Sequence, residues 1–337
     1  MHEELRQAPE VIARQLQADT DTLQALTQHL RTQCRGPLLT LARGSSDHAA
    51  HYMAYLIMSR LGRVVASMPP SVMTLHGSQV HTEGLASFAF SQSGQSPDLV
   101  LPTRDLTERG ATTVALVNAP ESPLSTAAHW HLGLHAGPER SVAATKSYIA
   151  QLVAGARIAA HWQGDAPLIQ ALQALPDDLL RAQAQNWDAA LAPLKNARGL
   201  YVIGRGLGLP IAMEAALKFK ETCTLHAEAF SGAELRHGPM ALVDAAHPVL
   251  IFAPRGPAQN GLLALASDLR AMGVPLLLAA PQGAADRIEL PLSQAQHPDL
   301  DPIVAVQSFY VMVEALSRAR GFDPDKPRHL KKVTLTH

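Results

Sequence analysis

The 337-residue chain has little of what marks several specialised classes of protein. Its 28 Lys and Arg residues nearly balance 29 Asp and Glu residues, so it has no basic surplus for binding DNA or RNA. Its two cysteines, Cys34 and Cys223, are too few for a disulfide framework and fit a reducing compartment. Aromatic residues make up only 4%, while hydrophobic residues reach 47%, which is typical of a globular protein.

Signals of other functions are also missing. No run of uncharged apolar residues reaches the roughly 18 that a membrane-spanning helix needs, and the charged N-terminus has no apolar signal core. We therefore expect a cytoplasmic protein without membrane contact. There is no Walker sequence, no Gly-x-Gly-x-x-Gly after the first strand and no Gly-x-Ser-x-Gly elbow. His, Asp and Glu residues show no metal-ligand spacing, so we expect neither a catalytic metal nor a cofactor.

A serine-rich turn, Ser-Gln-Ser-Gly-Gln-Ser at residues 91–96, is the most informative feature that is present. It follows an apolar strand ending near residue 90 and precedes a helix that begins at Pro97, with Ser96 as N-cap. Hydroxyls and free N–H groups then gather at the positive end of a helix, which suits a phosphate monoester. The hexapeptide alone leaves an ordinary polar turn equally open.

The chain repeats itself once, at an offset of 162 residues. Two of the matches pair short apolar runs, and the third pairs two glycine turns that each follow an apolar strand. The matching segments are 38–44 and 200–206, 91–94 and 253–256, and 113–116 and 275–278. Because such runs alternate with helical patterns, the fold class is predicted to be α/β, with two tandem doubly wound parallel sheets.

Five segments are predicted from this repeat and from the composition between the copies. Helical patterns flank the two domains, and the Pro-rich, basic C-terminal tail is typical of an extended segment. The segments are an N-terminal helical segment (1–29), a first domain (30–165), a helical linker (166–189), a second domain (190–325) and a tail (326–337).

The two copies differ at the serine turn. The first copy has Ser91, Ser93 and Ser96, while the second has Ala253 and Arg255 at the first two of these positions. A purely structural turn would have less reason to differ between copies. The difference therefore favours phosphate binding by the first copy.

A second turn follows the first strand, at Gly44, Ser45 and Ser46. Open parallel sheets bind ligands at the carboxyl ends of their strands, so this turn and the serine turn can line one crevice. Gly44 permits a close backbone approach, and Ser45 or Ser46 can cap a helix that we expect over residues 47–61.

A charged helix is predicted over residues 210–221 of the second copy. Glu214, Lys218 and Glu221 fall on one face of it. The simplest interpretation is that this helix face is exposed to solvent and that the three residues form ion pairs there. The alternative is an acid–base pair near a ligand crevice, in which each group shifts the pKa of the other.

A histidine loop follows that helix. Ser231 and Glu234 have the spacing of a capping box, and His237 directly precedes Gly-Pro. Since glycine and proline fix the backbone there, His237 is expected on an exposed turn.

In this order, the motifs resemble those of the sugar isomerase (SIS) family, especially the isomerase half of glucosamine-6-phosphate synthases and the SIS-type glucosamine-6-phosphate deaminases. The resemblance covers residues 36 to 337. The matching motifs are the serine turn (91–96), His-Ala-Gly-Pro-Glu (135–139), Val-Ala-Ala-Thr-Lys (142–146), the helix ending at Glu221, Gly-Ala-Glu-Leu-Arg-His-Gly-Pro (232–239) and the tail (325–332).

The resemblance implies a role for each matching residue. Glu221 would move a proton between C1 and C2 of the sugar, and Lys218 would orient substrate and tune Glu221. His237 would open the sugar ring from a neighbouring subunit of a homodimer, and Lys332 would form an imine with the carbonyl carbon. The residues implied to bind phosphate or sugar are Ser46, Ser91, Gln92, Ser93, Ser96 and, through its backbone, Val142.

The resemblance also implies an activity without a cofactor. Met1 and His2 begin a helix where the synthase has a glutaminase domain, so we expect net release of ammonia: glucosamine 6-phosphate and water give fructose 6-phosphate and ammonia. The alternatives are a deglycase acting on amino-acid adducts of the same sugar and a non-catalytic phosphosugar sensor. Family sensors usually carry a DNA-binding domain or lose the acid–base residues, whereas Glu221, His237 and Lys332 are all present here.

Overall fold

The computed structural model describes residues 1–332, so the last five residues of the predicted tail lie outside the described part. The chain divides into two compact units, each built around one sheet. The first-sheet unit comprises Glu10–Glu139, Lys146–Gln173 and the described end of the tail from Lys331. The second-sheet unit comprises Met1–Pro9, Arg140–Thr145 and Ala174–Leu330.

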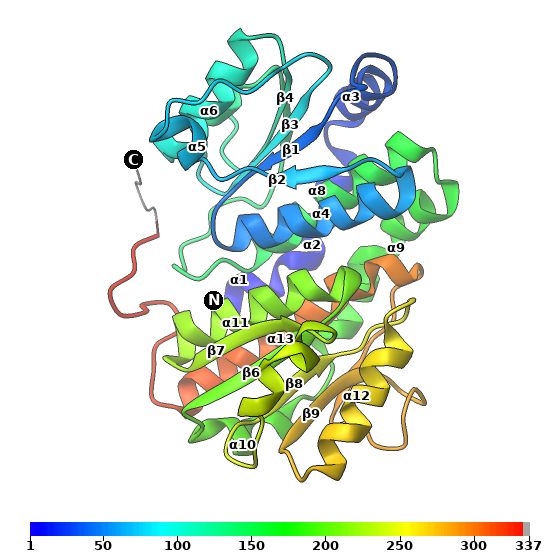
Figure 1. Cartoon of the computed structure of the whole chain (residues 1–337), viewed down its shortest axis with the longest axis vertical. Helices are drawn as coiled ribbons and strands as arrows, with labels where there is room; N and C mark the ends of the chain where they lie inside the picture. The colour runs from blue at the N-terminus through cyan, green and yellow to red at the C-terminus, as the bar shows by residue number, and fades with distance from the viewer. Residues whose placement is uncertain (333–337) are drawn as a thin grey trace. The chain divides into compact units, whose positions relative to one another are not determined.

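Each unit contains five parallel strands in the same spatial order (Figure 1). The first sheet has the order β2-β1-β3-β4-β5, and the second has β7-β6-β8-β9-β10 when counted from β7. The strands of the first sheet are β1 (Leu38–Leu41), β2 (Val65–Ser67), β3 (Ala86–Ser91), β4 (Thr112–Val117) and β5 (Trp130–Gly133). Those of the second are β6 (Gly199–Gly204), β7 (His226–Ser231), β8 (Val249–Phe252), β9 (Leu276–Pro281) and β10 (Leu290–Leu292).

This shared topology confirms the predicted fold class of two tandem doubly wound, flavodoxin-like domains. Strands β1 and β4 lie on the repeated apolar runs of the first copy, and β6 and β9 on those of the second. The matched turns 91–94 and 253–256 lie at the ends of β3 and β8. Strand β7, which begins at His226, was not predicted, because its residues His226-Ala227-Glu228-Ala229-Phe230-Ser231 contain no continuous apolar run.

Helices cover both faces of the first sheet. The helices α5 and α6 lie on one side of it and α4 and α8 on the other (Figure 1). A β-carbon added at Gly155 in α8 would lie 2.8 Å from Cβ of Met53, so glycine permits the close packing of α8 on α4. The helices are α2 (Ala8–Gln17), α3 (Thr20–Gln33), α4 (Ser45–Leu61), α5 (Ser71–Thr74), α6 (Pro97–Glu108), α7 (Pro123–Ala127) and α8 (Lys146–Gln163).

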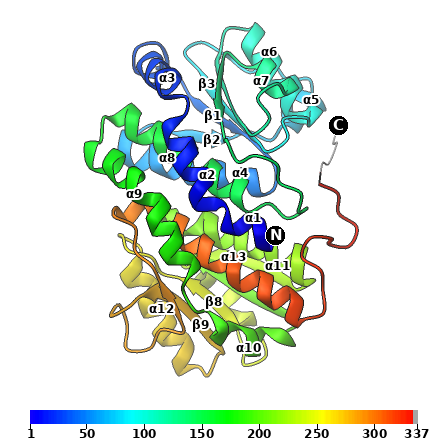
Figure 2. The ribbon, with the colours of Figure 1, turned by 180° about the vertical axis from the view of Figure 1, so that it is seen from behind.

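The second sheet is covered in the same way. Helices α11 and α13 lie on one face and α12 on the other, as both views show (Figures 1 and 2). Side chains of α12 such as Leu262 and Leu265 pack with alternate residues of β6, β8 and β9 in one apolar core. The helices of this unit are α1 (His2–Arg6), α10 (Leu191–Lys195), α11 (Leu209–Cys223), α12 (Gln259–Ala271) and α13 (Asp301–Ala319). Helix α9 (Ala166–Gln183) belongs to the first-sheet unit up to Gln173 and to this unit from Ala174.

One helix among the described residues is long and apolar enough to cross a membrane by length and composition alone. It covers Pro298–Ala319, and 89% of its most apolar window is buried inside the structure. Such burial is typical of the core helix of a globular unit. It explains why α13 lacks an exposed polar face.

Candidate functional site

The serine turn lies at the carboxyl end of β3, as the sequence predicts. Oγ of Ser91 accepts the N–H of Gly94 at 2.9 Å, and Oγ of Ser93 accepts that of Gln95 at 3.3 Å. Gly94 has a φ of +65°, and a β-carbon there would lie 2.2 Å from Oγ of Ser122. The turn is therefore held in a fixed shape by hydrogen bonds from its own backbone N–H groups to Ser91 and Ser93.

Ser96 occupies the N-cap position of α6, as predicted, but its side chain does not cap the helix. Its carbonyl oxygen accepts the N–H groups of Leu99 and Val100 at 3.0 and 3.1 Å. Pro97 begins the helix and has no N–H to satisfy. The helix start thus relies on backbone geometry and proline for its shape.

The turn after β1 differs from the prediction in one respect. Helix α4 begins at Ser45 with Gly44 as N-cap, so the expectation that Ser45 or Ser46 caps a helix starting at residue 47 is wrong. Gly44 has a φ of +55°, which lets its carbonyl oxygen accept the N–H groups of Asp47 and His48. Ser45 and Ser46 therefore lie in the first helical turn, where backbone N–H groups point toward any bound anion.

An ion pair that sequence reasoning missed joins these two turns. Nε of Arg43 lies 2.9 Å from Oδ2 of Asp98, which is buried in the first turn of α6. The Arg43 side chain is still 54% exposed, so it places a cation beside both turns. From α8, Nε2 of Gln151 also donates to Oγ of Ser46 at 2.9 Å. Gly44–Ser46 and the serine turn are therefore parts of one polar edge of the first sheet.

The charged face of α11 is buried, so the solvated-face interpretation is wrong. Side-chain exposure is 0% for Glu214, 1% for Lys218 and 20% for Glu221. Nζ of Lys218 lies 2.6 Å from Oε2 of Glu221 and 3.2 Å from Oε1 of Glu214. The hydroxyl of Tyr310, on α13, donates to the same Glu214 oxygen at 2.9 Å.

The two carboxylates determine the charge of Lys218. Burial by itself would lower the pKa of Lys218, but Glu214 and Glu221 outweigh this effect and raise the pKa above its ordinary value. Lys218 is therefore an ammonium ion at neutral pH. Of the three groups on this face, only Glu221 has appreciable exposure, so it is the one that can exchange a proton with a ligand.

His237 is exposed at the end of a short 3-10 helix, Glu234–His237, and Gly238 follows with a φ of +149°. The predicted capping box is wrong: Ala233 is the N-cap, and Oγ of Ser231 accepts its N–H at 3.4 Å. His237 lines a cavity of about 340 Å³ together with Arg205 and residues of α12. Glu221 is not among the residues lining that cavity.

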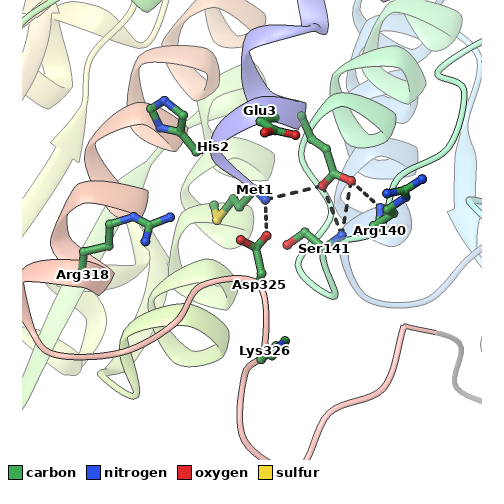
Figure 3. A pocket seen from close by; sticks show the side chains of 9 residues that line it. Met1, His2, Glu3, Arg140, Ser141, Arg318, Asp325 and Lys326 are labelled. Carbon is green, nitrogen blue, oxygen red and sulfur yellow. Dashed lines mark hydrogen bonds and ion pairs between the residues drawn. The ribbon is translucent and has the colours of Figure 1, made fainter.

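Val142 lies in the Arg140–Thr145 segment of the second-sheet unit, between β5 and α8. The Glu4 carboxylate accepts the backbone N–H groups of Arg140 and Ser141, which fixes the loop just before Val142. The adjoining pocket, shown in Figure 3, has a volume of about 690 Å³, and the loop meets α1, Asp325 and Lys326 there. The loop and the start of the tail are thus held in one region of this unit.

Lys332 is the last described residue, and its Nζ lies 3.1 Å from Oε2 of Glu139 in the first-sheet unit. The structure thus brings together three sets of residues within the units. They are the two turns joined through Arg43, the Glu214–Lys218–Glu221 face, and Lys332 with Glu139. The catalytic and binding roles of these residues remain predictions.

A family model described as the SIS domain matches residues 32–160 and 193–280. A glutamine–fructose-6-phosphate aminotransferase (isomerizing) of Aeropyrum pernix is 33% identical over 321 residues, which cover 88% of this chain and 51% of that protein. The chain thus spans about half the length of the curated relatives it matches.

Solved structures are similar over nearly the whole chain. One, from Silicibacter pomeroyi and provisionally named a phosphosugar isomerase, has 38% identity and a TM-score of 0.91, covering 96% of this chain and 98% of that one. A glucosamine-6-phosphate deaminase from Thermotoga maritima has 22% identity and a TM-score of 0.75, covering 98% and 100%. At that identity, the second likeness shows the fold alone.

Proposed function

The chain belongs to the SIS domain family, and on this basis we propose that it is a phosphosugar aldose–ketose isomerase acting on an aminosugar phosphate. The observation that carries the proposal is the Glu221 carboxylate. It is partly exposed and is held by a fully buried lysine that is itself fixed from the other side by Glu214. Aldose–ketose isomerisation needs one such positioned base, which takes a proton from one carbon and returns it to the next.

The phosphate would bind at the edge formed by the two turns of the first sheet. Donors there would be the hydroxyls of the serine turn, Gln92 and the first-turn N–H groups of α4. Arg43 would add a positive charge, since its guanidinium is anchored by Asp98 and still half-exposed. Binding the remote phosphate would place the reactive carbons and lower the entropic part of the barrier.

Proton transfer would be carried out by Glu221. The carboxylate would abstract the proton at one of the first two carbons and deliver it to the other, while the Lys218 ammonium holds the carboxylate in place. Because Lys218 is 1% exposed, it would act through Glu221 as a positioning residue. Such a base typically contributes about 10²–10⁴-fold in rate.

The remaining roles complete the reaction. His237 would open the sugar ring in the active site of the partner subunit of a homodimer, and Lys332 would bind the carbonyl carbon as an imine, with the backbone of Val142 against the sugar. The specific reaction that we propose is glucosamine 6-phosphate and water giving fructose 6-phosphate and ammonia. Proton transfer would leave an imine at C2. The amine of Lys332 would add to that carbon and expel ammonia, and water would then hydrolyse the lysine imine to fructose 6-phosphate and the free lysine.

A coupled assay tests this function. The pure chain is incubated with glucosamine 6-phosphate, and both ammonia and fructose 6-phosphate are measured; equal molar release supports the proposal. Binding without turnover would contradict it and identify a sensor. Turnover only of amino-acid adducts of fructose 6-phosphate would identify a deglycase.

A further inference from the structure

The carboxylate of Glu139 is completely buried, in the loop between β5 and α8. Its Oε2 accepts the hydroxyl of Ser147 at 2.6 Å and the ammonium of Lys332 at 3.1 Å. Its Oε1 accepts the backbone N–H of Ser147 at 3.2 Å. This buried acid therefore has at least three donors, and one of them comes from the tail, 193 residues further along the chain.

Two of these donors are independent of the tail. Ser147 belongs to the first turn of α8, an 18-residue helix whose positive end faces the carboxylate. A buried carboxylate is costly unless it is hydrogen-bonded, and Ser147 satisfies both of its oxygens. Glu139 is thus a fixed anion that can receive a cation in a defined position.

The backbone of the tail does not by itself fix the position of the Lys332 side chain. After α13 ends at Ala319, no helix or strand occurs in the remaining described residues, up to 332. A lysine side chain on such a segment samples many rotamers, and holding one of them requires a partner. Lys332 is 23% exposed with its ammonium against Glu139, whereas the neighbouring Lys331 is exposed.

We infer that Glu139, held by Ser147, is a positioning residue that fixes the Nζ of Lys332. The pair keeps the tail lysine in one orientation before a substrate binds. This inference rests on the proposed function, in which Lys332 meets the carbonyl carbon of the sugar. The fixed geometry would favour rate more than substrate affinity, because the phosphate is bound elsewhere.

Competitive acylation tests the pair without any turnover. The full-length protein is treated with trace acetic anhydride, and labelling of Lys332 is compared with that of Lys331 by mass spectrometry. We expect slower labelling of Lys332 in the wild type. Glu139→Gln should raise it about tenfold by removing a charged hydrogen bond, and Ser147→Ala should raise it less. Exposed Glu121→Gln is the matched control and should change nothing.

Equal labelling of the two lysines in the wild type, or no change in Glu139→Gln, would overturn the inference. If Glu139→Gln fails to fold, Ser147→Ala carries the same test. In the steady state, Glu139→Gln should lower kcat about tenfold with KM nearly unchanged, and Glu139→Asp should recover part of the loss. If the wild type turns over no aminosugar phosphate, the proposed function fails. The labelling experiment still shows whether Glu139 fixes the position of Lys332.

Discussion

The turn after β3 and the turn after β8 occupy equivalent places in two sheets of the same topology, but different groups fill them. In the first, the serine turn leaves hydroxyls and a helix N-terminus at a polar edge. In the second, Arg255 replaces Ser93 at the 162-residue offset, and its guanidinium forms an ion pair with the Asp301 carboxylate. Asp301 accepts the backbone N–H of Arg255 at 3.3 Å and its Nε at 2.7 Å.

This difference shows how one fold can serve two purposes. The second turn holds an internal anion, and the hydrogen bonds that Arg255 donates to the buried Asp301 raise the pKa of Arg255 above its ordinary value. The Asp301 carboxylate occupies that turn, and its ion pair with Arg255 stabilises the unit. At the first turn, the hydroxyls of Ser91 and Ser93 accept backbone N–H groups of the turn itself, and we propose that this turn binds an external phosphate. We propose that the serine turn binds the phosphate of the substrate and that Glu221 transfers the proton.

The largest effect is expected from removing the base. Glu221→Gln should lower kcat about 10³-fold, since a general base contributes roughly 10²–10⁴. Affinity for fructose 6-phosphate, measured by calorimetry, should stay within a few-fold because the phosphate turn is intact. Exposed Glu228→Gln is the control. A variant that keeps wild-type turnover would remove α11 from the reaction.

Mixing inactive subunits tests whether His237 acts across a dimer. Glu221→Gln and His237→Ala chains are each expected to be inactive. After subunit exchange, about a quarter of all sites should carry both wild-type groups and recover activity. Absence of recovery, with exchange proven by native mass spectrometry, would confine His237 to its own subunit.

Lys218→Met tests the buried ion pairs. Two carboxylates would lose their cation, so we expect about 3–5 kcal/mol less stability in urea unfolding, compared with exposed Lys220→Met. The folded-state pKa of Lys218 is raised, so its contribution is complete below the ordinary value of 10.5 and is lost only as pH rises through the raised value. The difference between wild type and variant should thus be constant from about pH 6 to about pH 9. If the stability difference between wild type and Lys218→Met became smaller within this pH range, the raised pKa of Lys218 would be contradicted.

A substitution at the second turn should lower the stability of the protein and leave its affinity for sugar phosphate unchanged. Asp301→Asn replaces the carboxylate paired with Arg255 by a neutral amide. It should lower the free energy of unfolding in urea by about 2 kcal/mol and leave phosphate affinity unchanged. Asp286→Asn, exposed in the same unit, is the control. If Asp301→Asn instead abolished sugar-phosphate binding, the second turn would be part of the substrate site.

The smallest effect is expected at the first turn, with the opposite pattern. Ser93→Ala should weaken fructose 6-phosphate binding about fivefold to tenfold, the loss of one charged hydrogen bond, while leaving the unfolding midpoint nearly unchanged. Gln95→Ala, in the same turn but exposed, should bind normally. Loss of stability without loss of binding in Ser93→Ala would make this turn structural.

Much of the fold could be predicted because it is local and repeated. The apolar strands, the helix start at Pro97 and the 162-residue offset are all visible in the sequence, and the topology follows from βαβ units. The start of α4 was missed by two residues because Gly44, and not a serine, caps it.

The partners of the site residues could not be predicted. Asp98 binds Arg43 from 55 positions away, and Tyr310 binds Glu214 from 96 positions away. Local patterns carry no information on such contacts, which depend on how the strands and helices pack. For the same reason, the sequence could not show that the charged face of α11 is buried.

A crystal structure with bound fructose 6-phosphate tests the central claim most directly. We expect the phosphoryl group on the serine turn and the first two sugar carbons within roughly 3–3.5 Å of the Glu221 carboxylate. A sugar phosphate bound elsewhere, or one on the turn with Glu221 of every subunit out of reach of the sugar, would contradict the account.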